Sequence, residues 1–286
     1  MIAVALAVLA AASNALASVL QRRAARTAPP GQAFRLGLIA YLMHRPAWLG
    51  GIAALIGGFA FQAAALMFGG LSLVQPILVV ELPLTMVFIG RVFRVRLDHR
   101  SWLAVGVLTA GLAMLLLGAR PSEGHQIPGR AMWAVATLVT LGLVALLLTA
   151  ARLATGAGRA AILGVAAGLG FSFTAALMKQ AVREVQHPAT LLTTWTVYAM
   201  ILAGLVSLFL LQNAFQSGSL VAVQPALTVA DPVASIGYGV GLFGETIRLG
   251  AWSVLEIFAI GLIVYGSTLL AQSPPFRRHK VMAAGT

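Results

Sequence analysis

Residues 74–83 (VQPILVVELP) and residues 223–232 (VQPALTVADP) carry nearly the same sequence, 149 positions apart. Six of the ten positions are identical, and the glutamine and both prolines lie in register. A pair of small residues precedes each copy (Gly69-Gly70 and Ser217-Gly218), and a further apolar stretch follows each one. The match indicates an internal repeat.

The composition places most of the chain in a membrane. Of 286 residues, 60% are hydrophobic and 9% are charged, and the mean hydropathy is +0.94. A soluble domain carries roughly 25% charged residues, so this chain lacks the polar groups that a water-facing surface needs. Apolar stretches long enough to cross a bilayer occur at residues 2–20, 47–68, 71–89, 102–119, 132–151, 160–178, 190–211, 219–243 and 251–271.

The repeat divides these nine stretches into two related halves. We expect residues 1–130 to hold the first four helices, residues 131–159 a connecting helix, residues 160–272 the last four helices, and residues 273–286 a cytoplasmic tail. Corresponding helices are five crossings apart, so the two halves run through the membrane in opposite directions. The sequence therefore predicts an all-α polytopic membrane protein with two inverted-topology repeats, a construction typical of secondary transporters.

The distribution of Lys and Arg predicts the orientation. Fourteen of the 19 basic residues fall on one side of the expected helices and five on the other. The positive-inside rule puts the larger group in the cytoplasm, which leaves the N-terminus outside and the C-terminus inside a plasma or inner membrane. The longest cytoplasmic gap contains an apolar segment at residues 34–43, expected to be a short helix on the inner membrane surface.

The motifs around the two copies resemble those of a known superfamily of transporters. The segment ALMFGGLSLVQP (residues 65–76) and the segment 216–245, which ends in GLFGE, resemble the drug/metabolite transporter superfamily, especially its EamA-type proteins. The first segment is also similar to the NIPA-like magnesium transporter branch. The resemblance implies transport activity and ten helices in two inverted sets of five, whereas nine are found here.

Acidic residues inside the expected helices are the first candidates for a functional site. An ionisable group in a bilayer costs roughly 3 kcal/mol on insertion scales and marks a functional site by default. Glu81 and Asp231 each lie close to the second proline of a repeat copy, so we expect both near the midplane, one from each half. Glu256 lies in the first third of its helix, where a structural and a functional role are equally compatible with the sequence.

The helix around Asp231 carries a polar face. Five polar residues recur there at helical spacing, and we expect them to line a substrate or ion path: Gln224, Thr228, Asp231, Ser235 and Tyr238. The alternative is that they only bond neighbouring helices to one another. The first copy lacks a matching polar face, but Gln75 keeps its place and joins the expected path with Glu81; contact between helices is the alternative role for both.

Prolines and glycines add two expectations about the backbone. The prolines of the two copies are expected to break their helices and free backbone carbonyls: Pro76, Pro83, Pro225 and Pro232. Two glycine pairs at a spacing of four predict close helix crossings: Gly164 with Gly168, and Gly237 with Gly241.

The charge pattern favours a cationic partner for the carboxylates. No basic residue falls within the core of an expected helix, so an unpaired Asp231 or Glu81 should bind a proton or a cation. We therefore hypothesise that Asp231, together with Glu81, exchanges a proton or an inorganic cation against a small cationic or zwitterionic solute.

Other functions are disfavoured or kept as alternatives. The chain has no cysteine, all five histidines fall in loops, and there is no P-loop, so neither an enzyme nor a cofactor is expected. The basic residues lie in short gaps and form no stripe for nucleic acid, despite the net charge of +12; membrane lipid is the expected surrounding, and a homodimer is permitted but not required. One alternative is a divalent-cation channel or facilitator, and the other is a non-transporting membrane partner or lipid-translocation subunit.

Overall fold

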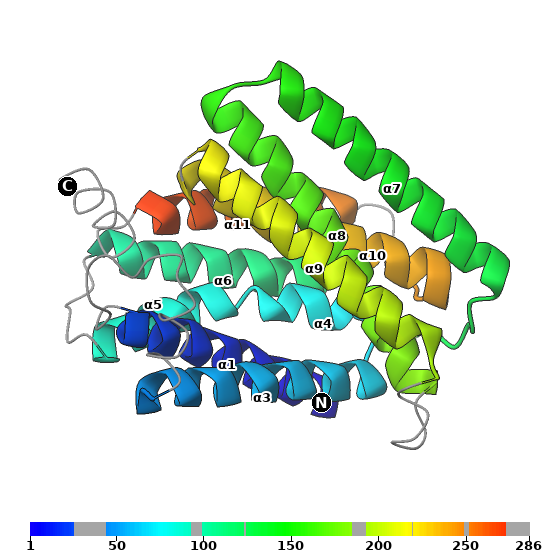
Figure 1. The fold of residues 1–286 in the computed structure, drawn as a ribbon, viewed down its shortest axis with the longest axis horizontal. Helices are drawn as coiled ribbons and strands as arrows, with labels where there is room; N and C mark the ends of the chain where they lie inside the picture. The colour runs from blue at the N-terminus through cyan, green and yellow to red at the C-terminus, as the bar shows by residue number, and fades with distance from the viewer. Residues whose placement is uncertain are drawn as a thin grey trace.

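The chain folds as a bundle of apolar helices (Figure 1). The computed structural model describes residues 1–25, 44–92, 99–122, 124–184, 193–218, 220–248 and 252–272. The helices within these ranges are α1 (Ile2–Ala25), α3 (Pro46–Phe68), α4 (Leu71–Leu78), α5 (Glu81–Val92), α6 (His99–Ala119), α7 (Arg130–Leu153), α8 (Gly156–Glu184), α9 (Trp195–Ser217), α10 (Leu220–Phe243) and α11 (Trp252–Gln272).

The helices have the length and composition of membrane spans. In the described ranges, eight helical segments are long and apolar enough to cross a membrane, with α4 and α5 together supplying one of them. In α11 a shorter apolar stretch runs from Val254 to Leu269. The expected all-α polytopic fold is therefore confirmed. The surface helix expected at residues 34–43 and the tail at 273–286 lie outside the described residues.

Similar helix pairs pack together in the two expected halves. α1 lies against α3 in the first half and α8 against α9 in the second, while α6 packs against its counterpart α11 (Figure 1). A Cβ at Gly58 of α3 would collide with Asn14 of α1, and Ser207 of α9 fills the space that a Cβ at Gly170 of α8 would need. Gly58 and Ser207 are 207 − 58 = 149 positions apart, the spacing of the two sequence copies. The boundaries of the two halves remain a prediction.

The third expected helix is broken in the middle. α4 ends at Leu78 and α5 begins at Glu81, so the expected helix over residues 71–89 consists of two pieces. The proline ring of Pro83 would crowd the carbonyl of Val79, four residues earlier. The break is closed by tighter bonds in which the amides of Val79, Val80 and Leu82 each donate to the carbonyl three residues before, at 3.0–3.1 Å.

The matching prolines of the second copy do not break their helix, contrary to expectation. α10 runs without interruption from Leu220 to Phe243 through Pro225 and Pro232, just as Pro76 lies inside α4. A proline in a membrane helix is tolerated where neighbouring helices and Ser or Thr side chains compensate for the lost bond. Here the neighbouring helix is α8, which packs closely against α10.

Only the first of the two expected glycine pairs makes a close crossing. A Cβ at Gly164 would lie 3.0 Å from the carbonyl oxygen of Val223, and one at Gly168 would lie 2.7 Å from the Cβ of Ala230, both on α10. At Gly237 and Gly241 an added Cβ would meet no described heavy atom within 4 Å. Small residues let backbones approach, and this role falls to the α8 pair.

These two kinds of helical glycine give a matched test of the α8–α10 crossing. We expect Gly168→Ala to destabilise the protein by about 1–3 kcal/mol, because the added methyl group overpacks the contact with Ala230. Gly237→Ala meets open space, and should be neutral or stabilising by about 0.5–1 kcal/mol, because alanine costs less than glycine in a helix. Melting temperatures of the two purified variants in the same detergent check this, and equal values would show that the crossing is not tight.

Candidate functional site

The polar face of α10 points into the bundle. Thr228 and Ser235 are buried, and Gln224, Asp231 and Tyr238 are half-buried. The hydroxyl of Tyr238 lies 2.6 Å from that of Thr140 on α7. All five residues of the expected face therefore lie on the protein side of α10 and not on an exposed face.

The backbone of Asp231 lies at one of the close contacts between α8 and α10. A Cβ at Gly168 of α8 would come within 3.1 Å of the Asp231 amide nitrogen. The Asp231 carboxylate accepts a hydrogen bond from the hydroxyl of Ser235, one turn further along, at 3.3 Å. In the described part of the chain, no Lys or Arg side chain lies within salt-bridge distance of this carboxylate.

Glu81 occupies the first position of α5, directly after the break. Its side chain is half-buried and hydrogen-bonded to Asn14 of α1. Glu81 thus bonds Asn14, which belongs to the same expected half of the chain. In the same way, Asp231 bonds Ser235 of the other half.

Gln75 lies in α4, on the N-terminal side of the break. Its side chain is 3% exposed, and its amide nitrogen has no hydrogen-bond partner among the described residues. One turn before it, Ser72 approaches Gly239 of α10, since an added Cβ at Gly239 would collide with the Ser72 hydroxyl. Because α4 and α10 pack together and residues 72 and 75 lie on neighbouring faces of α4, Gln75 supplies a free donor near the polar face of α10.

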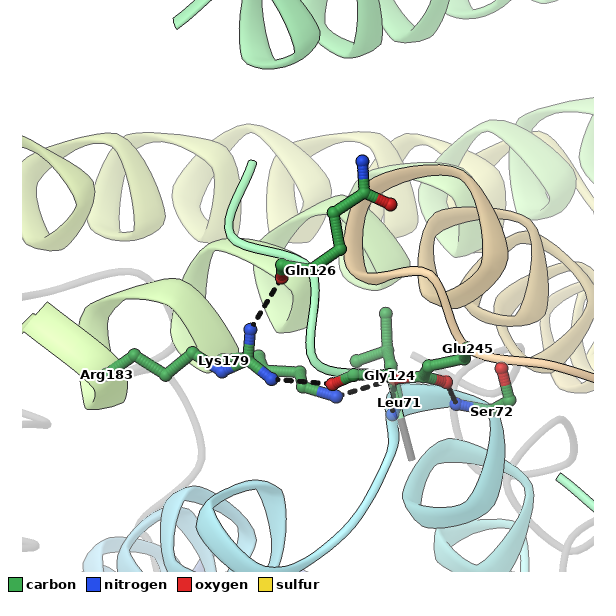
Figure 2. A network of polar contacts seen from close by, with 7 residues as sticks. All are labelled: Leu71, Ser72, Gly124, Gln126, Lys179, Arg183 and Glu245. Carbon is green, nitrogen blue, oxygen red and sulfur yellow. Dashed lines mark hydrogen bonds and ion pairs between the residues drawn. The ribbon is translucent and has the colours of Figure 1, made fainter. Parts of the chain in front are cut away.

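A buried ion pair outside the expected site dominates the polar contacts. Lys179 of α8 donates to the carboxylate of Glu245 at 2.5 Å, and their side chains are 2% and 0% exposed (Figure 2). The same carboxylate accepts the backbone amides of Leu71 at 2.6 Å and Ser72 at 2.8 Å, at the start of α4. These donors belong to the unpaired N–H groups of a helix N-terminus, where a negative charge is favoured.

Phe243 lies beneath the two cations of α8. The Lys179 ammonium lies 4.8 Å from the centre of its ring and the Arg183 guanidinium 5.1 Å. Arg183 also donates to the backbone carbonyls of Gly124 at 3.1 Å and Gln126 at 3.0 Å, in the connection between α6 and α7 (Figure 2). The ion pair and its neighbours therefore join α4, the end of α8, the α6–α7 connection and the segment after α10.

Two glycines allow these segments to meet. Gly244 adopts a φ of +63°, in the left-handed region that favours glycine. An added Cβ at Gly124 would collide with the backbone of residues 243–245. The two connections also share a bridge, in which the Ser122 amide donates to the Thr246 carbonyl at 2.9 Å.

The charge of Lys179 determines how Glu245 titrates. Glu245 lies two residues beyond the end of α10. Burial alone would raise the pKa of Glu245, but the Lys179 charge, with hydrogen bonds from Lys179 and Ser72, outweighs burial and holds this pKa below its usual value. The carboxylate is thus charged at neutral pH, and the pair is a true ion pair.

This pair corrects two expectations from the sequence. Lys179 was expected beyond the end of its helix at residue 178, but α8 continues to Glu184 and buries it. The expectation that every basic residue falls outside the helix cores is therefore wrong for Lys179, and the reason is that Glu245 neutralises the buried ammonium. The available signal was that no proline or glycine interrupts residues 171–184, so the helix had no reason to end at 178.

The fold and these contacts define a multi-pass α-helical membrane protein with a buried ion pair and buried polar side chains among its apolar helices. No family model matches the chain, and no solved structure matches it. The chain is 27% identical over 271 residues to an uncharacterized protein of Corynebacterium glutamicum (Cgl0250/cg0304), and the match covers 94% of each sequence. The likeness therefore extends over nearly the whole fold.

Removing one member of the ion pair should be far worse than removing both. Lys179→Met leaves Glu245 buried without its counter-charge, and we expect a loss of about 3–5 kcal/mol. The double variant Lys179→Met/Glu245→Gln holds no buried charge there, and its glutamine carbonyl can still accept the Leu71 amide. We expect the double variant to melt above Lys179→Met in detergent, and a lower melting temperature would contradict this account of the pair.

The stability supplied by Glu245 should depend on pH. Because its folded pKa lies below the unfolded value of about 4.3, its contribution is fully present above that value and is lost as pH falls through the folded pKa. The difference in melting temperature between wild type and Glu245→Gln should be constant from pH 7 to about pH 5 and shrink below about pH 4. A difference that grows on acidification would show that the pKa is not lowered.

Proposed function

We propose that the chain is a secondary transporter of a small cationic or zwitterionic solute, coupled to a proton or cation through Asp231. The observation that carries this proposal is the position of Asp231: on the interior face of a membrane-spanning helix, with a hydroxyl partner and no basic partner among the described residues. A carboxylate in such a place is stable when a proton or a cation neutralises it. It thus offers one site for which a cationic solute and a coupling ion compete.

The repeat architecture supports transport over a purely structural role. The equivalent crossings at Gly58 and Ser207 are what two halves of common origin would retain. Substrate sites in inverted-repeat transporters lie at the repeat interface near discontinuous helices. The break between α4 and α5 puts Glu81 at a new helix start, and Asp231 follows the equivalent position 81 + 149 = 230 by one residue.

The polar groups near Asp231 favour a solute that carries both a positive charge and a hydrogen-bond acceptor. Asp231 supplies the negative charge, and the unpaired amide nitrogen of Gln75 supplies a buried donor. The Lys179 ammonium does not favour an anionic solute, because Glu245 neutralises it. The uncompensated charge along α10 is acidic, as the proposal requires.

The orientation follows from the basic residues. In the sequence, fourteen of the 19 Lys and Arg fall in the gaps after the odd-numbered expected spans, with the C-terminal tail included. The positive-inside rule makes this side cytoplasmic, with the N-terminus outside and the protein in the plasma or inner membrane. The ion pair of Lys179 and Glu245 then lies at the outer end of the bundle.

A ligand-induced melting shift tests the proposal. Purified protein is heated with Mg²⁺, other inorganic cations, amines, amino acids, nucleosides and lipid head-group compounds at two pH values. A ligand that binds only the folded state raises the apparent stability, and we expect one amine or zwitterion class to do so. The shift should disappear in Asp231→Asn and weaken in Glu81→Gln, while Glu256→Gln, an acid on α11, should keep it.

Flux in proteoliposomes then separates the alternatives. Solute uptake that follows an imposed proton or cation gradient supports coupled transport. Mg²⁺ flux that ignores the proton gradient would replace the proposal with a divalent-cation facilitator. If no ligand shifts the melting temperature and Asp231→Asn leaves cellular function intact, the protein is instead a non-transporting membrane partner or lipid-translocation subunit.

A further inference from the structure

We propose that the Lys179–Glu245 pair is the outer gate of the transport path, and that the described structure is the state in which this gate is closed. The inference rests on the proposed transport function and goes beyond it, because none of the gate residues belongs to the expected path. The gate consists of Glu245, the Lys179 ammonium and the first two amides of α4.

All parts of the gate lie at one end of the bundle. Helices α4, α7, α9 and α11 begin at this end, because each follows the previous span in the opposite direction (Figure 1). Glu245 lies between α10 and α11, Arg183 near the end of α8 holds the α6–α7 connection, and Leu71 starts α4. One ion pair and its immediate neighbours thus tie together the connections at the outer end.

The gate joins the two halves of the repeat. Glu245 and Lys179 belong to the second half, whereas the amides of Leu71 and Ser72 belong to the first. Opening a path between the halves at this end therefore requires the Glu245 carboxylate to leave α4. The contact between α10 and α4 would have to separate as well.

Glu245 covers the end of the polar face that leads to Asp231. A Cβ at Gly239 would collide with the Glu245 carboxylate as well as with Ser72. Gly239 lies one turn beyond Ser235, and Ser235 lies one turn beyond Asp231. The carboxylate thus closes the column of positions 231, 235 and 239 on its outer side.

The ion pair is suited to two states: a closed state in which the two charges are in contact, and an open state in which they are separated. The two buried charges hold each other in place, and separating them without water costs several kcal/mol. Entry of water and solute from outside would hydrate both charges and remove that cost. Gly244, with its positive φ, gives the segment that carries Glu245 a backbone position suited to a hinge.

The absence of cysteine from the chain allows a direct accessibility test, from the outside in intact cells and from the inside in inverted membrane vesicles. Ser72→Cys places one thiol within the gate, beside Glu245, and keeps the backbone amide that bonds Glu245. Thr228→Cys places a thiol on the opposite side of Asp231. Each single-thiol protein is labelled with a membrane-impermeant thiol reagent applied from its own side of the membrane, with and without Glu245→Gln.

We expect Glu245→Gln to raise the outside labelling rate of the thiol at position 72 by about tenfold, which corresponds to about 1.4 kcal/mol of lost closed-state preference. The inside labelling rate of the thiol at position 228 should not rise. The double variant Lys179→Met/Glu245→Gln should also expose the thiol at position 72, which separates opening from the instability of an unpaired lysine.

Glu184→Gln is the matched control for the gate variants. The Glu184 carboxylate lies at the same end of α8, but it bonds Gln180 and Thr196 within the α8–α9 pair. Its removal should therefore leave the thiol at position 72 protected.

An unchanged labelling rate at position 72 in both gate variants, or a rise at positions 72 and 228 together, would overturn the gate and make the pair a purely structural tie. The melting-shift experiment on Asp231 is independent of this labelling. If Asp231→Asn changes no ligand response while the thiol at position 72 behaves as expected, the outer gate stands and the solute site proposed at Asp231 fails.

Discussion

The carboxylate of Glu245 is the acceptor on which the ordered end of this bundle depends. It accepts hydrogen bonds from the ammonium of Lys179 on α8 and from two backbone amides of α4. Three segments far apart in sequence therefore meet at one buried charge. In a bilayer each unsatisfied polar group is expensive, and this arrangement satisfies the start of α4 and the buried lysine at once. The α6–α7 connection then packs over the same segment, where Gly124 leaves room for it.

The sequence was sufficient for the fold because membrane spans are determined by length and apolarity. The nine apolar stretches correspond to helices, and their ends differ from the structure by only a few residues at most positions. The larger differences have local causes. Pro83 divides the third span, whereas α10 continues through its prolines because it packs against α8. The positions of the prolines in the sequence do not predict which helix is interrupted.

The candidate site was predicted in part. The polar face of α10 could be read from helical spacing, and the structure turns it inward. The ion pair could not be read, because Lys179 and Glu245 are 66 positions apart and each follows an apolar run, where a charged residue normally indicates a loop. Their burial is a property of the pair, since either charge alone would be excluded from the interior. Composition therefore suggested an acidic interior, while the structure contains one neutral pair as well as the isolated acids.

The position of α7 has a consequence for how the protein enters the membrane during synthesis. α7 lies at the edge of the bundle with most of its length exposed, and packs mainly on α8 (Figure 1). It is also the most apolar of the described spans, whereas α10 is the least apolar. Its apolarity and its few contacts allow α7 to leave the translocon for lipid before a partner helix is present. α10 carries Asp231 and two prolines, and it needs α8 beside it. Because α8 precedes α10 in the chain, the order of these helices matches the order in which the bilayer can accept them.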